Sequence, residues 1–189
     1  MDSLAADIEQ FNSRLLLLAR DPVIGSEVLR LLLAEPSVIT QITAASEGGI
    51  RTAMKCGVPL AAFTEEIDEL IQGLPRERAP RGESTESTPV TLRLRDLTTL
   101  ALQVAQRLAL ENDTMAVMHF GLRSSTAEAL TRLGITQLES MTHQGHALLR
   151  LRKGDEPLVW DRLLIGNVSN KAWAFRVSHE TALLMSGAD

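Results

Sequence analysis

Basic side chains concentrate near the C-terminal end of the sequence. Residues 148–176 hold six Lys or Arg residues against three Asp or Glu residues. The cations are Arg150, Arg152, Lys153, Arg162, Lys171 and Arg176. This density predicts a surface that contacts DNA phosphates or an acidic partner protein. A solvated face that binds nothing accounts for the same density about equally well.

Residues 126–143 have the outline of a helix-turn-helix, with two short helices joined at Gly134-Ile135. In that motif the second helix enters the major groove of DNA, where Gln137 could pair with adenine. The side chains expected to point outward are Thr136, Gln137, Glu139, Ser140, Thr142 and His143. Glu139 would repel phosphate, so an αα-hairpin within a helical core is the more ordinary interpretation.

The remaining reactive side chains do not form a catalytic or metal-binding pattern. His119, His143 and His146 have no nearby Cys, and a zinc site usually needs four ligands. Cys56 is predicted to be a small buried apolar residue. The sequence has neither a glycine-rich phosphate loop nor a G-x-S-x-G motif. We therefore predict no enzyme activity, no cofactor and no metal site.

The composition favours an all-α fold. Apolar residues make up 44% of the 189 residues, aromatic residues only 3%, and Tyr is absent. The core must then consist largely of Leu and Ala, which are strong helix formers. No apolar run approaches the roughly 18 residues that span a bilayer. The acidic start, which lacks a basic signal-peptide region, and the single Cys56 lead us to expect a cytoplasmic protein.

Charge is distributed unevenly along the chain, whose net charge is −5. Residues 1–75 carry 5 Lys or Arg and 11 Asp or Glu, whereas residues 76–189 carry 14 and 13. A protein that binds DNA on its own usually has a surplus of cations. If this chain acts on DNA, another subunit is expected to supply most of the phosphate contacts.

Apolar spacing and helix-breaking residues predict the order of the elements. Helices are expected at 7–20, 23–34, 36–45, 50–56 and 64–71, with an extended run at 58–63. Residues 74–90 are predicted to be a flexible linker, because they are rich in Pro and charge. Further helices are expected at 92–110, 114–120, 126–133, 136–143 and 170–186, with an extended arm at 146–152. Residues 157–165 are ambiguous.

The two sides of the linker show the same succession of elements, offset by 88 to 90 residues. We interpret residues 1–73 and 91–189 as two related units, each ending in a short extended arm. Such units tend to pack about a pseudo-twofold axis. Few residues are identical between them, and helical proteins show similar spacing by chance.

Residues 96–152 resemble the FlhD family of bacterial flagellar transcriptional activators without a gap. The residues that carry the resemblance are Asp96-Leu97, Ala105-Gln106-Arg107-Leu108, Ala116, Gly121, Ala127, Leu130, Leu133, Gln137 and Arg152. Residues 173–185 match more loosely. The first unit matches weakly, through Asp7-Ile8 and Leu18-Ala19.

The resemblance implies an all-α protein that forms an intertwined homodimer and joins a zinc-containing partner, FlhC. The resulting heterohexamer activates transcription from promoter DNA, which FlhD alone binds poorly. The Cys that bridges some family dimers corresponds to Leu149 here, so a disulfide-linked dimer is not expected. We expect two tandem FlhD-like units packed as a pseudo-dimer, or a homo-oligomer. The alternative is a helical adaptor or chaperone-like interaction module without DNA binding.

Overall fold

The structure, a computed structural model, describes residues 2–73, 88–143 and 148–165. These residues form α1 (Asp2–Ala19), α2 (Gly25–Leu31), α3 (Pro36–Ala44), α4 (Glu47–Met54), β1 (Ala61–Phe63), α5 (Glu66–Gly73), α6 (Pro89–Glu111), α7 (Asp113–Phe120), α8 (Ser124–Thr131), α9 (Ile135–Thr142), β2 (Leu149–Leu151) and α10 (Pro157–Ile165). The fold is mostly helical, which confirms the all-α prediction. Four helices, one strand and a fifth helix occur in that order on each side of residues 74–87.

Local sequence signals set several helix boundaries. Pro36 occupies the first turn of α3, where its missing N–H costs nothing. Ser46 caps α4 by accepting a hydrogen bond from the backbone N–H of Gly49. Thr88 caps α6 in the same way, and α7 ends at Gly121 in the left-handed conformation that glycine adopts readily. The starts of α3, α4 and α6 and the end of α7 are therefore set by residues of the boundary itself.

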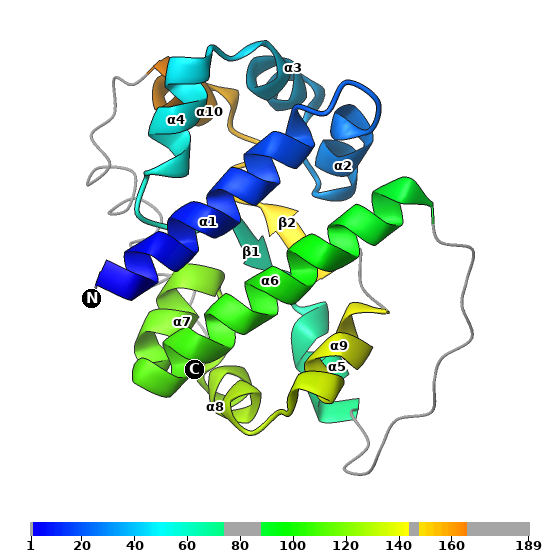
Figure 1. Cartoon of the computed structure of the whole chain (residues 1–189), viewed down its shortest axis with the longest axis vertical. Helices are drawn as coiled ribbons and strands as arrows, with labels where there is room; N and C mark the ends of the chain where they lie inside the picture. The colour runs from blue at the N-terminus through cyan, green and yellow to red at the C-terminus, as the bar shows by residue number, and fades with distance from the viewer. Residues whose placement is uncertain (1, 74–87, 144–147, 166–189) are drawn as a thin grey trace.

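The two long helices, α1 and α6, lie side by side in front of the small sheet and run in opposite directions (Figure 1). Their inner faces are apolar: Phe11, Leu15 and Ala19 are buried on α1, as are Ala101, Ala105 and Leu108 on α6. This spacing of three and four residues gives each helix one stripe that faces the core. The pair forms the central layer onto which α2, α3, α4, α7, α8 and α9 pack.

The sheet joins the two halves of the chain. β1 and β2 pair in antiparallel fashion, with Ala61 opposite Leu151, Ala62 opposite Arg150 and Phe63 opposite Leu149. The hydrogen bonds next to the sheet match on the two sides, because Thr64 N donates to Leu148 O and Arg152 N donates to Leu60 O. The register is thus centred on Ala62 and Arg150, one residue from each half.

Helices that follow the strands pack on the opposite half. α5 lies on α8, and α10 lies on α3 and α4. The aromatic residues also join the halves: the ring of Phe120 on α7 is 5.9 Å from that of Phe11 on α1 and 5.4 Å from that of Phe63 on β1. The buried apolar residues of both halves consequently form one continuous core.

One predicted boundary is corrected, and one ambiguous stretch is assigned. Residues 89 and 90, assigned to the linker, belong to α6, because Thr88 caps the helix one residue before Pro89. The ambiguous residues 157–165 form α10, whose Trp160 is fully buried and donates its indole N–H to Arg152 O at 3.1 Å. Residues 74–87, at the centre of the predicted linker, and the predicted helix at 170–186 lie outside the described residues.

Candidate nucleic-acid and partner interface

The cationic residues that follow the linker divide into two kinds. Arg150 is exposed at the middle of β2, with its two neighbours buried, and Arg162 is exposed on α10. Arg152 is half-buried, and its guanidinium donates to the backbone carbonyls of His119 and Met118 at the end of α7. A cation at a helix C-terminus is favourable, because the last carbonyls lack partners and carry partial negative charge. Arg152 therefore supports α7.

Lys153 is also held within the molecule. It adopts a left-handed conformation with φ 54°, and its Nζ lies 2.6 Å from Glu156 Oε1. Its side chain is only 16% exposed, so the ammonium group has little surface to offer a phosphate. Of the four predicted contacts in this region, Arg150 and Arg162 alone are exposed. Lys171 and Arg176 lie outside the described residues.

The predicted helix-turn-helix corresponds to α8 and α9, which both pack on α6. The side-chain amide of Gln106 on α6 donates to Leu130 O at 2.8 Å and to Leu133 O at 2.9 Å. These bonds fix the end of α8 to the long helix. Leu138 and Met141 bury the inner face of α9. The pair is thus an αα-hairpin anchored to the core.

The outer face of α9 is poorly suited to DNA. Gln137 uses its side-chain oxygen to accept the N–H of Gly134 at 2.9 Å, which caps its own helix. Thr142, predicted to be exposed, is buried, and its hydroxyl donates to Glu139 O at 2.7 Å. His143 is exposed, with Nδ1 2.8 Å from the same carbonyl. Glu139 and the 65% exposed Ile135 complete a face without a cation.

A buried carboxylate links the start of α8 to the first half of the chain. Asp68 on α5 accepts a hydrogen bond from the hydroxyl of Thr126, and its Oδ2 lies 2.9 Å from Nε of Arg123. Pairing and hydrogen bonding offset the cost of burying this charge. Sequence reasoning missed this contact, because nothing in the local pattern of either helix relates Asp68 to Arg123.

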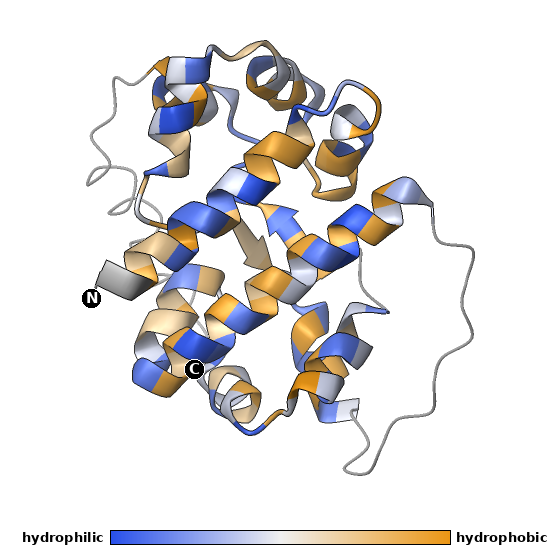
Figure 2. Ribbon diagram, in the orientation of Figure 1, coloured by the Kyte–Doolittle hydropathy of each residue, from blue (hydrophilic) through white to orange (hydrophobic). Residues whose placement is uncertain are grey.

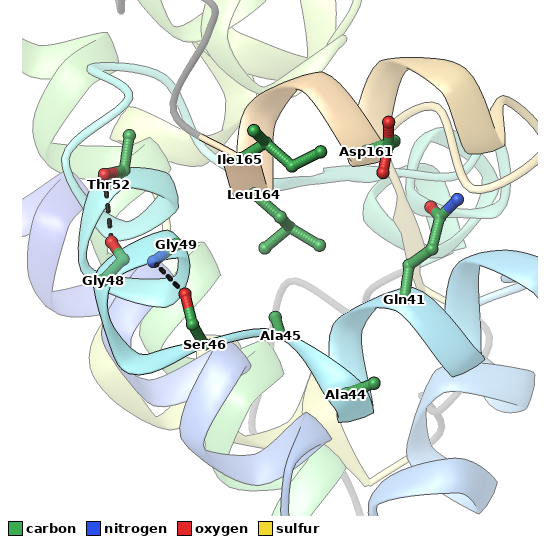
Figure 3. A pocket seen from close by; sticks show the side chains of 10 residues that line it. All are labelled: Gln41, Ala44, Ala45, Ser46, Gly48, Gly49, Thr52, Asp161, Leu164 and Ile165. Carbon is green, nitrogen blue, oxygen red and sulfur yellow. Dashed lines mark hydrogen bonds between the residues drawn. The ribbon is translucent and has the colours of Figure 1, made fainter.

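Two of the hollows on the described surface bear on function. The first, of about 550 Å³, lies between α3, α4 and α10 and is lined by Gln41, Ala44, Ala45, Ser46, Gly48, Gly49, Thr52, Asp161, Leu164 and Ile165 (Figure 3). Asp161 is the single ionisable residue among these ten, so the hollow has no acid and base pair for catalysis. The second hollow, of about 470 Å³, is a groove between α1 and α6.

Buried titratable groups are inert in this arrangement. Burial raises the pKa of the Cys56 thiol to about 11, so little thiolate forms near neutral pH. Burial, with a smaller contribution from the charge of Arg152, lowers the pKa of His119. Among the described residues, no group of three or more His, Cys, Asp or Glu could hold a metal ion. No helix in the described ranges is long and apolar enough to span a membrane.

Comparison with known proteins gives one family. Residues 86–189 match the family described as flagellar transcriptional activator (FlhD). This range covers α6 to α10 and β2, and it includes the cationic region and the α8–α9 pair. No curated protein and no solved structure matches the chain.

Proposed function

Since the chain belongs to the FlhD family of flagellar transcriptional activators, we propose that it is the FlhD-like component of a cytoplasmic activator complex. Its partner in this proposal is a FlhC-like, zinc-containing subunit, and promoter DNA is bound by the assembled complex. The family match over residues 86–189 is the observation that carries the proposal. The chain supplies a helical scaffold, while the partner supplies most of the contacts with DNA.

The distribution of cations supports this division of work. Proteins that bind specific DNA sites commonly neutralise about 6–10 phosphates. In the described part of residues 148–176, Arg152 and Lys153 are engaged internally, which leaves Arg150 and Arg162 exposed. Two exposed arginines add to an existing DNA interface, and the net charge of −5 leaves the whole chain without a surplus of cations. The chain alone is therefore expected to bind promoter DNA weakly.

A promoter-binding assay tests the proposal. The full chain is co-expressed with the FlhC-family subunit of the same organism, and DNA binding is compared for the complex and for each component. The complex should bind promoter DNA, and replacing both Arg150 and Arg162 with Ala should weaken binding by about tenfold at 150 mM salt. Arg51→Ala, an exposed change on α4, is the matched control. Failure of the two proteins to co-purify would contradict the proposal.

The acidic first half favours a second candidate, a helical adaptor that does not act on DNA. Its net charge of −6 would oppose approach to phosphates, as 5 Lys or Arg face 11 Asp or Glu over residues 1–75. The same assay separates the two candidates. A complex that forms with the partner but leaves every promoter fragment unbound would favour the adaptor.

We further propose that the chain is a covalent pseudo-dimer of two FlhD-like units, residues 1–73 and 91–189. Three observations support it: the repeated order of elements, the strand register centred on Ala62 and Arg150, and the packing of α5 and α10 on opposite halves. Two units related by a twofold axis would produce each of these.

Cleavage of the full chain within residues 74–87 tests this pseudo-dimer. A protease site inserted there should yield two fragments that remain together during size-exclusion chromatography, because the shared core extends across both halves. Fragments that separate without denaturant would show that the covalent connection, and not the interface, holds the units together.

A further inference from the structure

Buried positions recur along the two long helices at an offset of 89 residues. Ile8, Asn12, Leu15, Leu16 and Ala19 on α1 correspond in this way to Leu97, Ala101, Val104, Ala105 and Leu108 on α6, and all ten are buried. The same offset relates Asp7 to Asp96 and Leu18 to Arg107. If two copies of one unit paired, each contact between the units would occur twice. A contact whose residues differ between the units therefore distinguishes unlike from like pairing.

One such contact is the ion pair that bridges α1 and α6. Arg107 Nη1 lies 2.8 Å from Asp7 Oδ2, and the side chain of Asp7 is only 19% exposed. The corresponding residues, Asp96 and Leu18, both line the groove between the same two helices. Figure 2 shows hydrophobic and hydrophilic residues interspersed along these helices. Because a leucine cannot balance a carboxylate, Asp7 would lose its cation if the first unit paired with a copy of itself.

A second contact of this kind involves the residue before the third helix of each half. Arg123 and Glu35 are the N-cap residues of α8 and α3, and both adopt the extended conformation. Arg123 Nε lies 2.9 Å from Oδ2 of Asp68, whose side chain is 9% exposed. Glu35 also meets the opposite half, because its backbone N–H donates to Gly154 O at 2.8 Å. If two first units paired, Glu35 would replace Arg123 beside Asp68, and two carboxylates would repel each other at a buried site.

The centre of the strand register opposes the pairing of two second units. Ala62 lies opposite Arg150 in the sheet. Two second units in the same register would place Arg150 opposite Arg150, and like charges directly opposite each other on neighbouring strands are destabilising. Asp96 and Arg107 would still form an ion pair in that arrangement, so this barrier is smaller than the one against two first units. Pairing of unlike units satisfies all three contacts.

We propose that these charged contacts make residues 1–73 the specific partner of residues 91–189, so that the two unlike units bind each other in preference to a second copy of either. Specificity of this kind arises when the wrong pair brings like charges together or leaves a buried charge without its partner. The surface at which a like unit would bind is thus occupied within the chain. This inference rests on the pseudo-dimer proposed above and adds which units can pair.

Reassortment of cleaved chains tests the selectivity. The full chain, with a protease site within residues 74–87, is folded and then cleaved, once as ordinary and once as isotope-labelled protein. The two samples are mixed in urea near the unfolding midpoint, the urea is removed, and native mass spectrometry identifies the pairs. Unlike pairs that combine both samples should predominate, and like pairs should stay below about a tenth of the total. Pairing without selectivity would give like and unlike pairs in similar amounts.

Two charge reversals in the full chain sharpen the test. Glu35→Arg should raise the amount of first-unit pairs by about tenfold, because it places a cation beside Asp68 of the other copy. Glu27→Arg, at an exposed position on α2, is the matched control and should leave that amount unchanged. Arg123→Glu should weaken the association of the unlike fragments by about tenfold. Its control is Arg132→Glu, because Arg132 is 73% exposed and pairs with Glu128 on its own helix.

The outcomes separate this inference from the pseudo-dimer itself. A predominance of unlike pairs, together with a larger effect of Arg123→Glu than of Arg132→Glu, supports the selectivity. Like pairs as abundant as unlike pairs, or equal effects of the two reversals on α8 and its N-cap, overturn the selectivity and leave the pseudo-dimer intact. Fragments of the wild-type chain that separate without denaturant overturn both.

Discussion

In the first half of the chain, the buried side-chain amide of Asn12 on α1 holds the loop that leads into β1. In the second half, the side-chain amide on the long helix binds the end of α8 instead. Asn12 donates to Val58 O at 2.9 Å and to Met54 O at 3.3 Å, and it accepts from Leu60 N at 2.8 Å. Gln106 on α6 instead donates to two carbonyls at the end of α8. The same order of elements is thus fastened by different polar contacts.

A second difference concerns the turn that follows the second helix of each half. Gly121 ends α7 with φ 69°, and Leu33 adopts φ 61° two residues after α2. Glycine accepts this left-handed conformation readily, while an L-residue with a Cβ atom is strained there by about 1–2 kcal/mol. The order of the elements agrees between the halves. The polar contacts that hold the elements, and the residues at the left-handed turn, differ.

Removing the side-chain amides of Asn12 and Gln106 in turn should reveal the largest difference in stability between the two halves. Asn12→Ala leaves the N–H of Leu60 and the carbonyl of Met54 without this partner at a fully buried site, so we expect a loss of about 3 kcal/mol or more in the free energy of unfolding. Gln106→Ala, at a half-buried site, should cost about 1–2 kcal/mol. Urea titrations followed by circular dichroism measure both. Equal losses would show that the amides are equivalent anchors.

A methyl group at the contact between α4 and α10 should weaken the association of the halves. The Cβ atom of Gly49→Ala would overlap the backbone carbonyl of Leu164, and we expect a loss of about 2 kcal/mol in the free energy of unfolding. Gly48→Ala is the control on the same helix, because its Cβ would meet only Ser46 Oγ, at 3.9 Å. That change should be neutral or stabilise the protein by up to about 1 kcal/mol. A Gly49→Ala protein as stable as wild type would contradict the close approach.

Exchanging the turn residues sharpens the second difference. Gly121→Ala should destabilise the protein by about 1 kcal/mol, because alanine is strained at φ 69°. Leu33→Gly should be neutral or stabilise by up to about 1 kcal/mol, because the 67% exposed leucine loses strain and little packing. Thermal melts of both variants report the sign. Destabilisation by Leu33→Gly would mean that its side chain holds a contact worth more than the strain.

The smallest expected effect is a pH dependence confined to the second half. His119 on α7 is neutral in the folded protein to a lower pH than in the unfolded chain, because burial lowers its pKa. Its contribution to stability is complete above pH 6.5 or so and is lost as the pH falls below that value. Urea midpoints between pH 7.5 and 5.5 should fall less for His119→Gln than for wild type. A slope for His119→Gln as steep as that of wild type would show that another group causes the pH dependence.

Much of the helical order could be predicted from residues near each boundary. Pro36, Ser46 and Gly121 act within one turn of their own helix, so a single sequence contains the whole signal. The extended runs were also predictable, but their pairing was not, because Ala62 and Arg150 meet only through the tertiary fold.

The interface residues were harder to predict for the same reason. Arg152 looked like part of a basic patch, yet it supports the end of α7, a helix more than thirty residues earlier in the chain. Thr142 looked exposed because its helix was expected to face solvent on that side, whereas the folded protein buries it. The sequence gives the number of cations in a segment. Which of them stay exposed depends on the contacts that they make in the folded protein.

The strand pairing has a consequence during synthesis. β1 ends at Phe63, and the residues that complete its ladder begin at Leu149, so the ribosome must add nearly ninety residues before the edge is covered. At about 5–20 residues per second, the nascent first half waits roughly 5–20 s with that edge and its apolar surroundings unpaired. The edge of β1 therefore stays unpaired during synthesis for longer than it would in a protein whose paired strands are consecutive in sequence.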